Sequence, residues 1–569
     1  MLQHCLLGPS ANSKDAAYCF KRLLNGLCSG RAAARQGYAS AFCSFLKIAY
    51  STGALEEIQQ ETNDNTDESL LVFVRKELLK TTDPKQALSE KFGKAKGSEE
   101  RDYLFGRLFG ILSVVRSGIL APSGDNILQV KQVSAGLVND LVELYHHKKW
   151  MREPTAHGIV TLMNSLYQAS KDSSEDSKVV LNHLVRDSIV PKLFAGKAIQ
   201  DFSAEQIAVA VSIQSHMDLF DCSDLPAPLN QAILSASTIP TLSDALCATS
   251  TVVHPRSHIV WDMLWQFLTT ESPSEHGRVR ILCKSCPVSD EPAAQVVKAL
   301  MQSVVTESLL AIGTDGEGSN PTHERRALAL SIVRAACGGQ LNSSTAGPFV
   351  IATDAKLLEN AILTPDIVKR LFLDIICAAG GSSKSAHMLK PLALHVLETI
   401  VESDALSEVD SAESLDRRLS FAKTLLANDT RFDGRTKTAT VSNLLLLNDS
   451  VETTYNKELG DMWTKYIDFV TERILRASLD AKGRKDHMKI DEEASRLSSH
   501  EALGYADLLF NAAKRILRLQ VATDDEERAD FEKFRSSIVQ RILGFLMASA
   551  FFDCSNLSGP DNKPKKKKG

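Results

Sequence analysis

The residues of this sequence that could do metal chemistry begin with a pair of cysteines, since thiolates and imidazoles are the usual zinc ligands. Cys283 and Cys286 have the spacing of one half of a zinc site. A second pair does not follow at the distance of a zinc ribbon, and the nearest histidine, His276, lies in a polar segment. The sequence therefore predicts no zinc site at this pair.

Two histidine pairs are the other metal candidates. His146 and His147 are adjacent, so on a helix their side chains point about 100° apart and are poorly placed to share an ion. His254 and His258 have helical spacing, but Pro255 lies between them and no third ligand is near in sequence. We expect no metal and no other cofactor at either pair.

The common catalytic signatures are missing from the sequence. It contains no P-loop, no GxSxG elbow, no HExxH pair and no GxGxxG after a strand. Nucleotidyl transfer needs paired carboxylates for two magnesium ions. The nearest candidate, Asp315, stands in a glycine-rich segment without a second Asp two residues on. We therefore expect a protein that is not an enzyme.

The elements that would position any site are helices. Of the 569 residues, 44% are hydrophobic and 24% charged, as in folded soluble proteins, and only 6% are aromatic. Apolar residues recur at i, i+3, i+4 and i+7, whereas strand alternation is nearly absent. After Pro292, one predicted face contains Ala293, Val296, Val297, Leu300, Met301 and Val304, and the opposite face contains Gln295, Lys298 and Gln302.

A chain of this length with about twenty such helices is too large for one core, which stops growing near 250–300 residues. Stacked helix pairs solve this problem, so we expect an all-α, HEAT- or armadillo-like solenoid. A clean repeat period is not visible in the sequence, and the prediction depends on helix number and chain length. The expected organisation is a flexible start at 1–14, a solenoid at 15–555 and a basic disordered tail at 556–569.

The charge distribution limits contacts with nucleic acid to local surfaces, because the net charge is −5. The dense basic cluster at the end of the sequence is a candidate nuclear-import signal, or alternatively an ordinary solvated tail; it comprises Lys563, Lys565, Lys566, Lys567 and Lys568. Eleven cysteines without regular spacing and an amino terminus without a secretory pattern predict reduced thiols inside the cell.

Several segments carry a family resemblance. The first is Tyr18–Leu27 followed by Ser29–Tyr38, which predicts two amphipathic helices joined by a short elbow. The second contains Gly106 and Gly110, four apart on one helix, where we expect a neighbouring helix to approach closely. Further blocks of the same kind are Leu144–Glu153, His254–Asp262, Thr322–Leu330, Leu363–Arg370 and Arg431–Thr438.

Together these blocks span about residues 15 to 445, and in this order they resemble the amino-terminal half of the family of Myb-binding protein 1A and DNA polymerase phi. Members of that family are commonly longer, with an acidic low-complexity stretch and further helical repeats. The resemblance therefore implies nothing about functions that belong to those further segments of the longer members. The chain could be a short form or a fragment.

The resemblance implies a protein of the nucleus and nucleolus that acts in ribosomal RNA gene transcription and ribosome assembly and binds transcription factors. The expected function is that of a scaffold, without a membrane or a small-molecule substrate. Its expected partners are nucleolar and transcription proteins, with ribosomal DNA chromatin or pre-ribosomal RNA as further candidates. One alternative is a karyopherin-like transport adaptor, which would carry an acidic inner surface. The other is DNA polymerase activity, which the missing carboxylate pair disfavours.

The basic residues of the first helices favour a nucleic-acid or partner-binding surface over the adaptor. They are expected to point outward, although solvated helix faces would look the same in sequence. The candidates are Lys21, Arg22, Arg31, Arg35, Arg101, Arg107 and Arg116.

Overall fold

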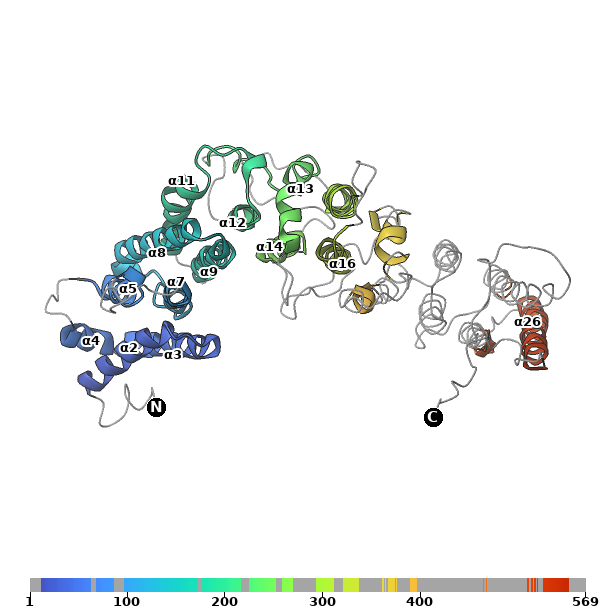
Figure 1. Ribbon diagram of the computed structural model, residues 1–569, viewed down its shortest axis with the longest axis horizontal. Coiled ribbons are helices and arrows are strands. Elements are labelled where there is room, and N and C mark those ends of the chain that lie inside the picture. The colour runs from blue at the N-terminus through green and yellow to red at the C-terminus, as the bar shows by residue number, and fades with distance from the viewer. Residues whose placement is uncertain are drawn as a thin grey trace, which may run out of the picture. The chain divides into compact units, whose positions relative to one another are not determined.

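The computed structural model is all-α, as the sequence predicts (Figure 1). The residues that it describes are 12–62, 68–85, 97–171, 175–215, 225–251, 258–269, 293–311, 321–336 and 525–551, with short stretches between 361 and 519. Among these residues, no helix combines the length and the apolar character that crossing a bilayer requires.

The chain divides into two compact units, Met1–Val296 and Val297–Gly569. The first unit contains most of the described helices. They are α2 (Ser13–Leu27), α3 (Ala32–Ser51), α4 (Ala54–Thr62), α5 (Leu70–Thr81), α7 (Gly97–Arg116), α8 (Ile127–His147), α9 (Arg152–Lys171), α10 (Glu175–His183), α11 (Val190–Leu193), α12 (Ala204–Ser215), α13 (Ile239–Cys247) and α14 (Ile259–Thr269).

Shorter helical segments connect some of these helices. The 3₁₀ segments are η1 (Gly124–Asn126), η2 (Lys149–Met151), η4 (Ile199–Asp201) and η6 (Ala248–Thr251). A π-helical segment, η3 (Leu184–Ile189), lies between α10 and α11.

Within the first unit, the helices pack in two rows. One row runs α3, α7, α9, α12 and α14, and the other runs α4, α5, α8 and then α10 with η3 (Figure 1). Glu100 at the start of α7 contacts His147 at the end of α8, so these two helices, which lie in different rows, run in opposite directions. This is the arrangement of a helical solenoid, although it does not identify the repeat type, which stays a prediction.

The core of the first helices is built from aromatic rings. Phe20 of α2 lies 5.9 Å from Phe42 and 6.2 Å from Phe45 of α3, and it stacks on Phe73 of α5 at 5.8 Å between ring centroids. The predicted opening helix pair is confirmed, since α2 ends at Leu27 and α3 begins at Ala32. The four fully buried Phe rings fix how α2, α3 and α5 meet.

The predicted close approach at the two glycines of α7 is confirmed. A Cβ atom at Gly106 would lie 2.7 Å from the Sγ of Cys28 and 3.1 Å from the carbonyl oxygen of Leu27. A Cβ atom at Gly110 would overlap the side chain of Leu78 in α5. Both glycines therefore let α7 pack directly against the end of α2 and against α5.

The helix predicted after Pro292 is confirmed, and the boundary between the two units falls within it. Helix α15 (Ala293–Ala299) continues into the π-helix η7 (Leu300–Leu309), and Val296, Val297, Leu300, Met301 and Val304 are buried. Gln295, Lys298 and Gln302 are exposed, which confirms the opposite face. The remaining helices of the second unit are α16 (His323–Ala336), η10 (Val368–Leu373) and α26 (Asp525–Phe551).

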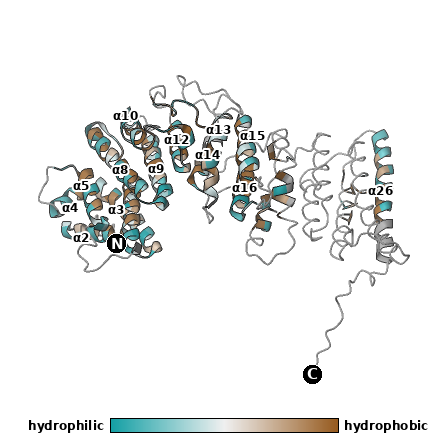
Figure 2. Cartoon of the chain, turned by 45° about the horizontal axis from the view of Figure 1, so that its top comes forward, coloured by the Kyte–Doolittle hydropathy of each residue, from teal (hydrophilic) through white to brown (hydrophobic). Residues whose placement is uncertain are grey.

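Figure 2 shows apolar and polar residues on different sides of single helices such as α8 and α16, as expected for helices with one buried stripe. In the second unit, η7 packs on α16, and α16 packs on η10. The guanidinium of Arg370 in η10 donates to the carbonyl oxygen of Leu310 at 3.1 Å.

Some predicted features lie outside the described residues. They are the cysteine pair Cys283 and Cys286, His276, His254, Asp315, the block Arg431–Thr438 and the basic tail from Lys563 to Lys568.

Candidate interaction surface

Five of the seven basic residues singled out in the sequence are exposed, as expected. Lys21 and Arg22 lie on α2, Arg31 directly precedes α3, and Arg101 and Arg116 lie near the two ends of α7. Arg101 and Arg116 are fifteen positions apart on one helix, or about 22 Å at 1.5 Å per residue. The seven residues therefore do not form a single patch.

Arg35 does not face outward, and this expectation is wrong. Its side chain is only 6% exposed, and its Nη1 atom donates to the Oδ1 of Asp102 at 2.7 Å and to the Ser29 carbonyl oxygen at 2.6 Å. The guanidinium also lies over the ring of Phe105, 5.4 Å from its centroid. A buried charge is tolerated when a carboxylate and hydrogen bonds compensate it, and here both are made through Nη1.

Arg107 is also turned inward. Its side chain is 11% exposed, and its Nη1 atom lies 3.6 Å from the Oε2 atom of Glu143 in α8. It therefore contributes to packing between the two rows, and the expectation of an outward Arg107 is wrong. Whether the exposed basic residues bind nucleic acid or a partner stays a prediction.

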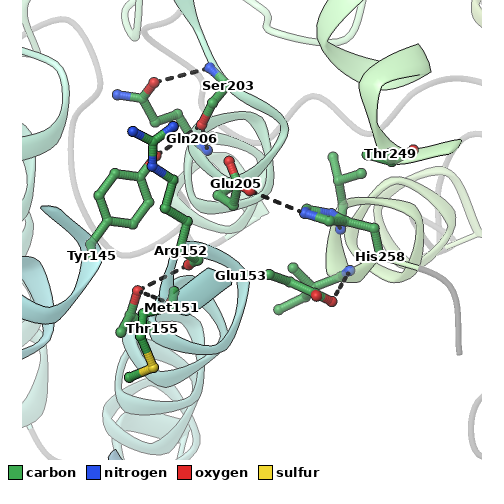
Figure 3. Close-up of polar contacts among 12 residues, drawn as sticks. Tyr145, Met151, Arg152, Glu153, Thr155, Ser203, Glu205, Gln206, Thr249 and His258 are labelled. Atoms are coloured by element: carbon green, nitrogen blue, oxygen red, sulfur yellow. Dashed lines mark hydrogen bonds and ion pairs between the residues drawn. The ribbon is translucent and has the colours of Figure 1, made fainter. Parts of the chain in front are cut away.

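The starts of α9, α12 and α14 meet at a polar junction (Figure 3). The backbone N–H of Ile259, at the start of α14, donates to the Oε1 of Glu153 in α9 at 3.2 Å. His258 contacts the Oε1 of Glu205 in α12 through its Nε2 atom at 3.5 Å. We call this set, Glu153, Glu205, His258 and Ile259, the α9–α12–α14 junction.

The histidine of this junction is a helix cap. Its Nδ1 atom accepts the backbone N–H of Val260 at 3.1 Å, which assigns the Nε2 proton to the contact with Glu205. Burial of Glu205 favours its neutral form, but hydrogen bonds from His258, Ser203 and its own backbone outweigh burial and lower the pKa to about 2. His258 thus holds two helices together, and its geometry is not that of a metal site.

A second contact joins α8, α9 and α12 beside the junction. The hydroxyl of Tyr145, near the end of α8, lies 2.9 Å from the Oγ of Ser203, and the guanidinium of Arg152 lies over the tyrosine ring at 5.6 Å (Figure 3). Burial raises the pKa of Tyr145. The phenol therefore stays neutral and acts as a hydrogen-bonding strut between helices.

An exposed aromatic residue lies in η2, just before α9, and the sequence did not point to it. Trp150 is 43% exposed, and its ring packs against Phe105 of α7 with 5.1 Å between centroids. Lys148 and Lys149 precede it, and Lys148 pairs with Glu100 at 3.7 Å. We call Arg101, Phe105, Lys148, Lys149 and Trp150 the Trp150 corner. The available signal was a tryptophan in a polar segment just after the buried stripe of α8 ends.

Other reactive groups in the described residues are structural. Burial, followed by the nearby Asp102 carboxylate, raises the pKa of the Cys28 thiol to about 12, so it is a poor nucleophile. Within the described ranges, no three His, Cys, Asp or Glu residues are grouped so that they could hold a metal ion.

The fold and this corner define an all-α helical-repeat protein with an exposed aromatic and basic surface. The sequence profile of the DNA polymerase phi family matches residues 18–568, and the chain belongs to that family. This confirms the resemblance seen in the motifs.

A curated relative is the rDNA transcriptional regulator pol5 of Schizosaccharomyces pombe, which is 27% identical over 191 residues. The match covers 34% of this chain and 17% of the relative, so it reaches only a small part of that protein. No solved structure matches the chain.

Proposed function

We propose that the protein is a nuclear and nucleolar scaffold that supports ribosomal RNA gene transcription and ribosome biogenesis. The observation that carries the proposal is family membership together with a relative named as a regulator of rDNA transcription. The two rows of helices in the first unit support it, because extended helical arrays present large surfaces to partners.

In this proposal the protein works by binding and not by catalysis. Its partners are nucleolar and transcription proteins, and ribosomal DNA chromatin or pre-ribosomal RNA would be contacted at local basic surfaces. The α9–α12–α14 junction supports this reading, since Glu205 and His258 contact each other between α12 and α14 and His258 also caps α14. Entry into the nucleus would use the lysines between Lys563 and Lys568.

The test is affinity purification of the endogenously tagged protein, followed by mass spectrometry and imaging of the tag. We expect RNA polymerase I factors and early ribosome-assembly factors, with the signal concentrated in nucleoli. A variant without residues 563–569 should accumulate in the cytoplasm if those lysines form the import signal. Recovery of importin-cycle proteins at the nuclear envelope would instead support the transport adaptor, and a cytoplasmic protein with neither set would contradict both.

A further inference from the structure

We propose that the Trp150 corner binds single-stranded nucleic acid, with an unpaired base stacked on Trp150 and the phosphates near Lys149 and Arg101. This inference deepens the proposed function. It rests on that function only for the source of the strand, which would be a transcript or unwound DNA. The ligand is defined by its chemistry, an unpaired base next to a phosphate.

The aromatic part of the corner is held rigidly from beneath. The Trp150 ring packs on Phe105 with 37° between ring planes, and Phe105 is in turn contacted by the guanidinium of Arg35. Arg35 is fixed by Asp102 and by the Ser29 carbonyl oxygen. A partly exposed tryptophan that rests on a supported ring is prepared for stacking without further ordering of the protein.

The charges beside the ring suit a phosphate backbone. Arg101 lies one helical turn before Phe105 on α7, so both side chains project from the same face, and Lys149 is adjacent to Trp150 in the chain. Both cations are exposed, and among the described residues neither takes part in an ion pair.

Two carboxylates that flank Arg101 in the chain already have partners. Glu100 contacts Lys148 and His147, which lowers its pKa, with the hydrogen bond from His147 the larger cause. Asp102 pairs with Arg35. The corner therefore leaves Arg101 and Lys149 to attract an anion.

A single strand fits this surface better than a duplex or an acidic peptide. The bases of a duplex are stacked on each other and offer no face to a protein ring, whereas unpaired bases stack on exposed aromatic side chains. An acidic peptide could use the cations, but its carboxylate side chains bring no aromatic face to stack on Trp150. Stacking with nearby cations is also tolerant of sequence, so binding should depend on strandedness more than on base identity.

The experiment measures fluorescence anisotropy of labelled oligouridylate of about 12 nucleotides, a usual site size for such surfaces. The full chain is titrated onto this RNA, onto oligothymidylate of the same length and onto a duplex. We expect Trp150→Ala to weaken binding of the single strands roughly 5- to 100-fold, and Trp150→Phe to retain part of the affinity. Tyr18→Ala removes a ring that is 62% exposed on α2 and should leave the affinity unchanged.

The contribution of Lys149 and Arg101 is measured separately, by the salt dependence of the affinity. Lys149→Ala and Arg101→Ala should each reduce the slope of log affinity against log salt by about 0.7, the value for one phosphate contact on a single strand. Lys47→Ala, which removes an exposed cation on α3, is the matched control and should leave the slope unchanged. RNA binding stronger than that of DNA would identify a transcript as the source of the strand, and the reverse would identify unwound DNA.

A second measurement guards against a variant that fails to fold. Bound bases should quench the intrinsic fluorescence of the wild-type chain, and Trp150→Phe, which keeps a ring on Phe105, should lose most of that quenching. Failure of the wild type to bind single strands, equal affinity of Trp150→Ala, or duplex binding as tight as single-strand binding would each overturn the inference. The proposed function would survive such a result if the tagged protein still recovers transcription and assembly factors in nucleoli.

Discussion

At the scale of single residues, basic side chains that are close in the sequence differ in whether they are exposed or buried. Lys21, Arg22 and Arg31 are exposed, but Arg35 is buried because it lies seven residues before Phe42 and fourteen before Ala49 on the buried stripe of α3. The apolar periodicity that predicted the helix therefore also places Arg35 on the buried face of α3. The sequence could not supply its partner, Asp102, which comes from a helix 67 positions away.

Replacing Arg35 by Ala should destabilise the first unit by about 2–4 kcal/mol, because it leaves the Asp102 carboxylate, which is only 17% exposed, without its cation. The measurement is thermal or urea unfolding followed by circular dichroism. Arg31→Ala, four residues earlier and exposed, is the matched control and should change the free energy of unfolding by less than about 0.5 kcal/mol. Equal effects of the two substitutions would contradict the assignment of Arg35 to the core.

The Glu205 carboxyl should make the α9–α12–α14 junction sensitive to acid. Its folded-state pKa of about 2 is below the unfolded value near 4.5, so its stabilising contribution is complete above pH 4.5. That contribution is lost as the pH falls from there toward 2. Urea unfolding followed by circular dichroism at a series of pH values measures this loss of stability.

The expected result is that the wild type loses more stability between pH 5 and pH 3 than Glu205→Gln does. Glutamine keeps the shape and can still accept from His258, but it does not titrate. Glu56→Gln, which removes a charge from exposed α4, controls for the loss of one carboxylate. Parallel pH profiles for the wild type and Glu205→Gln would show that Glu205 does not contribute in this way.

At the scale of elements, Gly→Ala substitutions at the two glycines of α7 test whether steric overlap outweighs the gain in helix propensity. Gly→Ala inside an exposed helix ordinarily stabilises by about 1 kcal/mol. At Gly106, however, the new methyl would meet the backbone of Leu27, which cannot move aside, whereas at Gly110 it would meet the end of the Leu78 side chain. We expect Gly106→Ala to destabilise by about 1–3 kcal/mol and Gly110→Ala by less.

The matched control for these substitutions is Gly37→Ala in α3, where a Cβ atom meets nothing within 4 Å. It should be neutral or stabilising. The melting temperatures of the three variants rank their stabilities. A Gly106→Ala variant more stable than the wild type would show that α2 and α7 are less tightly packed than the structure indicates.

The sequence predicted helix existence and buried faces well but could not predict how helices are joined. The face containing Val296, Leu300 and Val304 is buried as expected, because hydrophobic periodicity is local information. The same hydrophobic pattern did not predict the π-helical turns of η7. Trp150 was missed for a related reason: its support by Phe105 is a contact between helices that are 45 positions apart in sequence.

At the scale of the whole molecule, a row of helices that contact only their neighbours should spread a disturbance over a short range. The fold class followed from length and periodicity, since no single core could bury so many amphipathic helices. The row order α3, α7, α9, α12 and α14 came only from the structure. In such arrays, stability is nearly a sum of local terms and nearest-neighbour interfaces.

Gly106→Ala should therefore raise backbone hydrogen exchange locally. The substitution disturbs α7 where it meets the end of α2, so we expect faster exchange in α2, α3, α5 and α7, each of which contacts α7 or α2. Exchange in α12 and α14, which lie further along the row, should be unchanged under the same conditions. Peptide-level hydrogen exchange with mass spectrometry measures both regions at once. A uniform rise through α14 would mean that the first unit opens as one cooperative body, because the disturbance between α2 and α7 would then extend to the α9–α12–α14 junction.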